Sequence, residues 1–300
     1  MNVTVLLITI MTSLMTTFTE PQQGKKGDAP LFSFGIITDA HCGDFDSEDD
    51  KYYRNSLAKI DTAMQVFDSE RLEFVIELGD LIDRDYSSLM PVNEALSKYK
   101  TPVLRCLGNH DYSVDRKYFK LLVPEGSNKG YYSLATNGFR FIILNGNEIS
   151  TYGPGTARER KKAEALIENM KVEGRENAED WNGGLSDEQM RWLQNELDSS
   201  KTAGEKVFIV CHFPVWPTEK HVLLNQEEVL TLLQNYDNII AWFAGHNHKG
   251  NYGNYNLMHC VTFRGMVETE NENSFAIVDV YRNKIWIRGF GREKSRILAY

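Results

Sequence analysis

The sequence predicts an α/β fold. Short apolar runs rich in β-branched and aromatic residues alternate with segments whose apolar residues recur at helical spacing, which is typical of layered α/β proteins. The chain has 300 residues, 42% of them hydrophobic, and a net charge of −9, so it contains enough apolar surface for a sizeable core. No linker or internal repeat interrupts the pattern, and we predict a single domain over residues 31–300.

Two segments precede this domain. Residues 1–22 include the apolar and Ser/Thr stretch Val3–Phe18, which is too short to cross a bilayer comfortably and resembles a secretory signal or hydrophobic leader. Residues 23–30 read as a flexible lead into the domain. We therefore expect an exported protein, periplasmic or extracellular. A membrane-tethered or a cytoplasmic protein is the alternative.

The first half of the domain is expected to begin with alternating strands and helices and to continue with a hairpin. The predicted strands cover residues 32–38, 74–78, 102–107, 130–135 and 139–145. A first helix places Leu57, Ile60, Met64 and Phe67 on one face, and a second covers about residues 86–100.

A long insertion at about residues 146–205 is expected to contain two helices and to shape a substrate pocket. The second helix begins at Ser186, which forms a predicted capping box with Gln189. The rest of the domain is expected to contain a helix at about 224–236 and strands at 206–211, 239–244, 256–264, 274–281 and 284–289.

Five polar clusters each follow one of the predicted strands. They are Asp39-Ala40-His41, Gly79-Asp80 with Asp83, Gly108-Asn109-His110-Asp111, Cys211-His212 and Gly245-His246-Asn247-His248. Because the carboxyl ends of strands in an open α/β sheet meet at one edge, these side chains are expected to converge. Five of the seven histidines lie in these clusters, whereas His221 and His259 are expected to be ordinary histidines.

The clusters contain a mixed set of oxygen and nitrogen ligands. Carboxylates, imidazoles and an Asn carbonyl together suit Mn, Fe or Zn better than Ca or Mg. Seven candidate ligands exceed the needs of one ion, and they would suit two divalent ions about 3.5–4 Å apart that share one carboxylate. Asp80 is the expected bridge, and such a pair of ions is suited to phosphate ester chemistry.

The order DxH, GDxxD, GNHD, His, GHxH resembles that of the calcineurin-like metallophosphoesterases. The resemblance implies a four-layered α/β/β/α sandwich. It also implies the roles of the ligands. One metal would be held by Asp39, His41, Asp80 and His248, and the other by Asp80, Asn109, His212 and His246.

The same resemblance assigns roles to three further residues. His110 is similar to the family's catalytic histidine, which stabilises the transition state or protonates the leaving oxygen. Asp111 would orient His110, and Asp83 matches a carboxylate behind the metal ligands. A hydroxide that bridges the two ions would attack phosphorus in line.

Longer strings resemble one branch of the family, the manganese-dependent ADP-ribose/CDP-alcohol diphosphatases. They are LFSFGIITDAHCGD, YYRNSL, WNGGLSDEQMRWLQNEL, EKVFIVCHFPVWP, FAGHNHKGNY, GMVETENENSFAIVDV and GFGREKSRIL. The loop at residues 43–51 is shorter than in that branch, and His41 stands where some members carry Gln. The resemblance implies an enzyme that hydrolyses the phosphoanhydride of nucleoside diphosphate-linked compounds, with Mn as the expected metal.

Several aromatic, amide and glycine residues are candidates for substrate contacts. Trp181, Asn182 and Gly183 belong to a loop in the insertion, and Phe45 and Tyr52 follow the first metal motif, where an aromatic ring could stack on a base. The C-terminal arginines 288, 292 and 296 are expected to form a solvated charged tail, with a phosphate clamp as the alternative.

The expected substrate is a small nucleotide, and the expected state is a monomer. A broader phosphodiesterase or phosphomonoesterase is the first alternative function, and a non-catalytic metal-binding scaffold is the second. The acidic balance offers no basic track for a polynucleotide. Cys42, Cys106, Cys211 and Cys260 show no zinc spacing, and the sequence names no disulfide pair among them.

Overall fold

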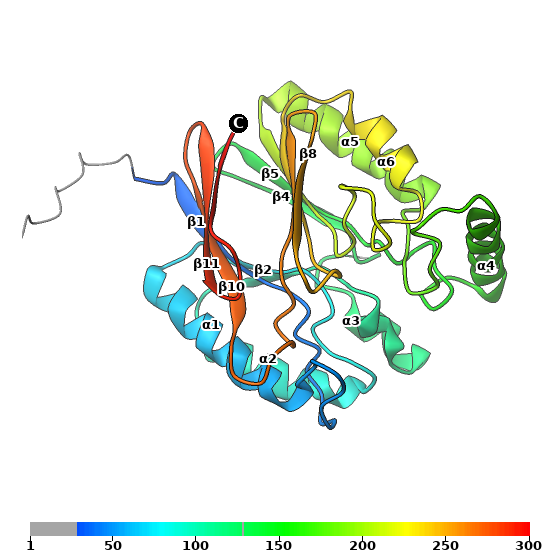
Figure 1. Ribbon diagram of the computed structural model, residues 1–300. Helices are drawn as coiled ribbons and strands as arrows, with labels where there is room; N and C mark the ends of the chain where they lie inside the picture. Colours follow the sequence, from blue (N-terminus) through cyan, green and yellow to red (C-terminus); the bar gives the residue numbers. More distant parts are fainter. Residues whose placement is uncertain (1–28, 128) are drawn as a thin grey trace, which may run out of the picture.

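The computed structural model describes residues 29–127 and 129–300, which form two six-stranded sheets packed face to face between helices (Figure 1). In spatial order the first sheet contains β12 (Arg296–Ala299), β11 (Lys284–Gly291), β10 (Ser274–Val280), β1 (Phe32–Ile37), β2 (Val75–Glu77) and β3 (Val103–Arg105). The second contains β4 (Tyr132–Thr136), β5 (Phe139–Ile143), β6 (Lys206–Val210), β7 (Ile239–Ala244), β9 (Met258–Thr262) and β8 (Asn251–Tyr255).

Both sheets are mixed. β1, β2 and β3 run parallel, whereas β10 pairs antiparallel with β1. In the second sheet β5, β6, β7 and β9 are parallel neighbours. The loops that follow these parallel strands therefore leave each sheet at one edge, and this edge receives the predicted polar clusters.

Aromatic side chains fill the space between the sheets. The buried ring of Phe34 on β1 lies 5.2 Å from that of Phe141 on β5 and 5.8 Å from that of Phe208 on β6, centroid to centroid. Both contacts have the edge-to-face geometry that aromatic quadrupoles favour. This aromatic layer holds the two sheets together.

Helices cover the outer face of each sheet (Figure 1). The α-helices are α1 (Ser56–Glu70), α2 (Leu89–Ser97), α3 (Phe119–Leu122), α4 (Ala157–Val172), α5 (Asp187–Ala203) and α6 (Gln226–Leu233). Short 3-10 turns cover Tyr53–Asn55, Tyr86–Ser88, His110–Ser113 and Arg116–Tyr118. Buried side chains of α1 and α2 pack on the first sheet, and those of α5 and α6 pack on the second. The predicted α/β/β/α sandwich is confirmed.

The helix caps differ from the prediction in an informative way. The Ser186 hydroxyl accepts a hydrogen bond from the Gln189 backbone, as expected, but the Gln189 side chain bonds Asn145 and Glu148 instead of closing the capping box. The complete capping box belongs to Thr156 and Glu159 at the start of α4, where no cap was predicted. The Gln189 side-chain amide therefore bonds to residues outside its own helix.

Two edge strands were missed, and two helices are shorter than predicted. β8 is polar and β12 has only four residues, so neither carries much periodic signal. α2 ends at Ser97 and α6 covers only Gln226–Leu233. Boundaries of this kind depend on tertiary packing more than on local propensity.

The three C-terminal arginines do not form a solvated tail, so that prediction is wrong. All three are half-buried in or beside the edge strands of the first sheet. Arg288 pairs with Asp279 at 2.8 Å, Arg292 with Glu268 at 3.2 Å and Arg296 with Glu293 at 2.8 Å. These carboxylate partners leave no free phosphate clamp in this segment.

The predicted leader over residues 1–22 and nearly all of the predicted lead over residues 23–30 lie outside the described residues. Within the described part of the chain, none of the helices combines the length and the apolar character needed to cross a bilayer. All four cysteines are buried free thiols.

Candidate metal centre

The five polar clusters meet at the edge where the parallel strands end. Asp39 and His41 follow β1, Asp80 follows β2, Asn109 follows β3, His212 follows β6, and His246 and His248 follow β7. Asp39, His41, Asp80 and His246 all have positive φ angles, between 46° and 67°. Such backbone conformations are costly for residues other than glycine and persist where the surrounding structure requires them. Here the tight turns aim side chains from both sheets at one place.

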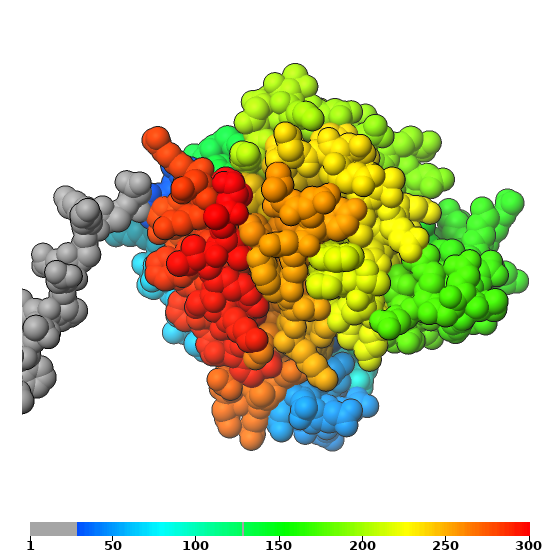
Figure 2. Space-filling model, turned by 45° about the horizontal axis from the view of Figure 1, so that its top comes forward, coloured from blue at the N-terminus to red at the C-terminus, as the bar shows by residue number. Residues whose placement is uncertain are grey.

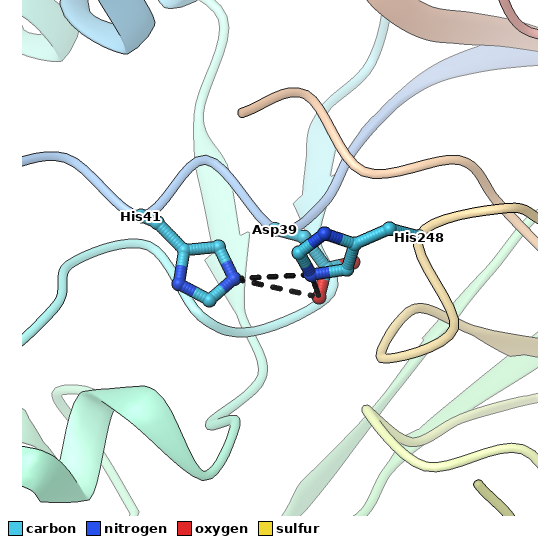
Figure 3. Close-up of side chains that lie close together, drawn as sticks. All are labelled: Asp39, His41 and His248. Carbon is cyan, nitrogen blue, oxygen red and sulfur yellow. Dashed lines mark hydrogen bonds and ion pairs between the residues drawn. The ribbon is translucent and has the colours of Figure 1, made fainter. Parts of the chain in front are cut away.

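The first group of donor atoms comes from Asp39, His41 and His248 (Figure 3). The Nε2 atoms of the two histidines are 3.2 Å apart, and Asp39 Oδ1 lies 3.4 Å from His248 Nε2. The outer nitrogens face carboxylates, because His41 Nδ1 is 3.6 Å from Asp83 Oδ2 and His248 Nδ1 is 3.3 Å from Glu268 Oε1. With Nδ1 protonated toward these partners, both Nε2 atoms carry lone pairs that converge on one point.

The second group contains Asp80, His212 and His246, with Asn109 beside them. His212 Nε2 lies 3.2 Å from both Asp80 Oδ2 and Asn109 Oδ1. Asp80 Oδ2 is also 3.6 Å from His41 Nε2, so this carboxylate lies between the two groups, where the sequence predicted a bridge. His212 Nδ1 lies 2.9 Å from the Leu78 carbonyl oxygen and donates to it, which leaves Nε2 as the ligand atom.

The electrostatics of the cluster favour bound cations. Burial alone would raise the pKa of Asp80, but His212 and His110 outweigh it, and the pKa lies well below its ordinary value. Burial would lower the pKa of His212 and His248, yet neighbouring carboxylates, Asp80 for the first and Asp39 for the second, raise each to about 9. The ionised carboxylates attract positive charge, and divalent ions that bind there would displace the protons of these two imidazoles.

The donor set therefore fits divalent metal ions. Seven side chains from two sheets supply carboxylate oxygen, amide oxygen and imidazole nitrogen, the mixture expected for Mn, Fe or Zn. His110 also approaches the first group, with its ring 4.4 Å from that of His41.

His110 lies at the rim of the cluster, with its side chain 30% exposed. Its Nδ1 is 2.9 Å from Asp83 Oδ1. Burial would lower the pKa of His110, but Asp80 and then Asp83 outweigh it and raise the pKa above its ordinary value. The ring is thus oriented by Asp83, and the neighbouring carboxylates favour its protonated form.

The prediction that Asp111 orients His110 is wrong. The fully buried Asp111 carboxylate accepts hydrogen bonds from the backbone N–H groups of Asp80, Leu81 and Gly108 at 3.0, 3.1 and 2.9 Å. Those bonds occupy both of its oxygens. Asp111 therefore stabilises the turn that presents Asp80, and the role assigned to it belongs to Asp83.

Asn182 and Gly183 were predicted to contact substrate, and the structure contradicts both predictions. Asn182 is completely buried, and its Oδ1 accepts a hydrogen bond from His246 Nε2 at 3.0 Å. This contact leaves His246 Nδ1 free to bind metal. Gly183 is buried as well, and a Cβ at this position would collide with the Gly146 carbonyl oxygen.

The three predicted aromatic contacts differ in their surroundings. The half-buried Trp181 packs against His246, with ring centroids 5.1 Å apart, so it borders the metal cluster. Phe45 is also half-buried, but its ring faces the Arg84 guanidinium at 5.2 Å and the Tyr53 ring at 5.8 Å. Tyr52 is half-buried, and its backbone N–H donates to Val267. Substrate contact by Trp181, Phe45 and Tyr52 stays a prediction.

Two residues beside the centre were not found from the sequence. Glu268 contacts His248, as described above, and His221 packs its ring 5.2 Å from Trp181 and 5.6 Å from His246. His221 was expected to be an ordinary histidine because it follows no strand. Only the fold brings the loop after β6 against the insertion.

The sequence model of the calcineurin-like phosphoesterases matches residues 32–250, a span that holds all seven candidate metal ligands and His110. The chain belongs to this family. The phosphoesterase motifs therefore account for the strand-end clusters, and the enzyme is a hydrolase of this class.

Relatives of this phosphoesterase span nearly its full length. A Xenopus laevis protein named manganese-dependent ADP-ribose/CDP-alcohol diphosphatase is 30% identical over 335 residues and covers 93% of each chain. Proteins of the same name from Homo sapiens and Arabidopsis thaliana are 30% and 27% identical. The human alignment covers 93% of this chain and 96% of the relative, and the Arabidopsis alignment covers 91% and 98%.

A solved structure agrees with this assignment. The crystal structure of a dimetal phosphatase from Danio rerio superposes with a TM-score of 0.82 at 25% identity, and the match covers 90% of this chain and 99% of that one. The fold of this phosphoesterase is thus shared with a relative described as binding two metals.

Proposed function

We propose that this phosphoesterase cleaves the phosphoanhydride bond of nucleoside diphosphate-linked compounds, with ADP-ribose and CDP-alcohols as the substrate class. The carrying observation is the strand-end cluster of seven ligands in a chain that aligns over more than 90% of its length with diphosphatases of this name. The products would be a nucleoside monophosphate and a phosphorylated sugar or alcohol.

The cofactors in this proposal are two divalent ions, with Mn favoured and Fe or Zn as alternatives. Asp39, His41 and His248 would hold one ion, Asn109, His212 and His246 the other, and Asp80 both. When bound, such ions supply charge for the phosphate oxygens and favour deprotonation of an attacking water. The relatives' name and the mixed donor set support manganese.

The chain's own residues provide the remaining chemistry. The carboxylate neighbours of His110 favour its protonated form, and Nε2 is the nitrogen that Asp83 leaves free. That nitrogen would deliver a proton to the oxygen that leaves phosphorus, or donate a hydrogen bond to it in the transition state. Asp83 keeps the ring in the orientation this step needs.

The proposed partner is a small molecule, and the proposed state is a monomer. The net charge of −9 provides no broad electrostatic surface for a polynucleotide. A general phosphodiesterase or phosphomonoesterase would use the same ions and the same histidine, so the choice of substrate decides between these functions. A non-catalytic scaffold is disfavoured because the sequence carries a ligand residue at each of the seven expected positions and a histidine at position 110.

Export through the N-terminal leader is a separate part of the proposal, supported by the apolar stretch Val3–Phe18 alone. Terminal sequencing of the protein from fractionated cells tests it. A mature terminus near residues 20–30 outside the cytoplasm is the expected result, and an intact terminus in the cytoplasm would refute export.

The test of the catalytic proposal is hydrolysis of a substrate panel by metal-stripped protein to which Mn is added back. The panel contains ADP-ribose, CDP-choline, a cyclic nucleotide and p-nitrophenyl phosphate. Fast Mn-dependent turnover of the two diphosphates, lost in His110→Ala, is expected. Turnover confined to p-nitrophenyl phosphate or to the cyclic nucleotide would replace the diphosphatase with the broader esterase.

A further inference from the structure

Lys51 lies beside the metal centre and has no role in the chemistry described so far. It belongs to the loop after β1 and forms backbone bridges with Glu48 and with Glu268. Its N–H donates to the Glu48 carbonyl at 3.0 Å, and the next residue, Tyr52, donates to Val267 at 3.0 Å. Figures 1 and 2 show this loop, in blue, next to the orange segment that follows β9.

The bridge between Lys51 and Glu268 sets the face from which the Lys51 side chain projects. The bridge is antiparallel, and residues paired in this way project their side chains to the same face, with Cβ atoms about 4.5–5.5 Å apart. The Glu268 side chain on that face reaches His248 Nδ1 at 3.3 Å. Lys51 therefore starts from the face that borders the first ligand group.

Lys51 is nevertheless not neutralised by a carboxylate. Glu268 already engages His248 through Oε1 and Arg292 through Oε2, the latter at 3.2 Å. Among the described residues, no carboxylate oxygen lies within 4.0 Å of the Lys51 ammonium. The half-buried Lys51 thus places a positive charge without an ion-pair partner at the rim of the metal centre.

Two neighbouring cations, Arg84 and Lys59, have hydrogen-bond or ion-pair partners of their own. Arg84 pairs with Glu48 at 2.8 Å, and the buried Lys59 ammonium donates to the carbonyl oxygens of Met266, Glu268 and Thr269. These groups stabilise the loops on either side of Lys51. Lys51 differs from these two cations, because its ammonium has no carboxylate or carbonyl partner among the described residues.

The histidine at the leaving-group side lies close to this face of the centre. The ring of His248 is 5.1 Å from that of His41, and the ring of His41 is 4.4 Å from that of His110, centroid to centroid. The face from which Lys51 projects is thus joined to His110 through adjacent histidine rings.

We propose that Lys51 binds the second phosphate of a diphosphate substrate, the phosphate that departs after attack on its neighbour. This inference rests on the proposed function and adds a specificity determinant to it. The departing phosphate gains negative charge as the P–O bond breaks. The Lys51 ammonium would offset this charge, whereas a substrate with one phosphate has no second phosphate for the lysine to bind.

The test compares Lys51→Met and Lys51→Arg with Lys161→Met, which removes the same charge from an exposed position on α4. Each Mn-loaded full-length variant is assayed with ADP-ribose and with p-nitrophenyl phosphate. Calorimetry then measures binding of the non-hydrolysable diphosphate α,β-methylene-ADP and of AMP. Far-UV circular dichroism and the unfolding midpoint verify the fold.

We expect Lys51→Met to lower kcat/KM for ADP-ribose by about 10- to 100-fold, the range of a charge-assisted hydrogen bond. Turnover of p-nitrophenyl phosphate should change less than about threefold. The same variant should lose most of the preference for α,β-methylene-ADP over AMP. Lys51→Arg should retain much of both properties, and Lys161→Met should behave as the wild type.

Equal losses on both substrates, or no loss on either, would overturn the proposal for Lys51. If the wild type turns over the ester but no diphosphate, the proposed function fails, and the calorimetric comparison alone judges Lys51. A diphosphate preference that Lys51→Met abolishes would still support the phosphate site. An unchanged preference, or none in the wild type, would refute it.

Discussion

The metal cluster and the rim around it are built in different ways. Every carboxylate and imidazole of the cluster follows directly after a parallel strand, so its position is set by the sheet edge. The rim comes from the loop after β1 and from the long insertion, whose side chains find partners through tertiary contacts. Phe45 packs against Arg84, and Asn182 points inward to His246. Position along a strand thus predicted which side chains converge, whereas residue type in a loop did not predict the partner that Asn182 takes.

Asp80→Asn is the strongest test of the cluster side of this comparison. Asp80 lies between the two donor groups, so its loss should weaken both ions at once, and kcat/KM should fall by about a thousandfold or more. Mn content measured on the purified variant should fall with it. Asp237→Asn, at an exposed site, serves as the control. Full Mn binding with normal activity would contradict the bridging role.

His110→Ala should reduce kcat by about a hundred- to ten-thousandfold without loss of metal, because the histidine serves the leaving group and not the ions. Steady-state kinetics alongside Mn binding separate the two roles. The effect should be smaller for p-nitrophenyl phosphate, since p-nitrophenolate leaves readily without a proton. An equal loss on good and poor leaving groups would argue against proton donation.

Asn182→Ala tests whether Asn182 supports a metal ligand or contacts the substrate. The amide oxygen holds His246 Nε2 at 3.0 Å, and removal of such a support typically weakens metal affinity about 10- to 100-fold. Calorimetric titration of metal-free protein with Mn measures this directly. Asn182→Asp keeps an acceptor and should lose less. A changed KM with unchanged Mn affinity would restore the original substrate-contact prediction.

Phe45→Ala should have the smallest effect, a change in KM for ADP-ribose below about threefold. Its ring is already engaged by Arg84 and Tyr53, so it is poorly available for stacking on a base. Trp181→Ala provides the comparison. Trp181 borders His246, so its substitution should raise KM more than Phe45→Ala does. An increase in KM of more than tenfold for Phe45→Ala would instead show that the Phe45 ring contacts the substrate.

Much of the fold was predictable because its signals are local. The apolar strands and the face formed by Ile60, Met64 and Phe67 on α1 appear in the structure as periodicity suggests. β8 and β12 were missed because short edge strands acquire their conformation from a neighbouring strand. The Gln189 side chain was misassigned because Asn145 and Glu148, distant in sequence, offered better partners than its own helix terminus.

The sequence by itself determined the layered α/β architecture, the strand-end clusters and their order, because these follow from hydrophobic period and from the convergence of parallel strands. Only the tertiary structure decided which side chain supports which ligand. It assigned Asp83 and not Asp111 to His110, Asn182 to His246, and Glu268 with Lys51 to the side of His248. The reason is physical: a buried polar group takes the partner that the packed chain brings within hydrogen-bond distance, and that distance is independent of separation along the sequence.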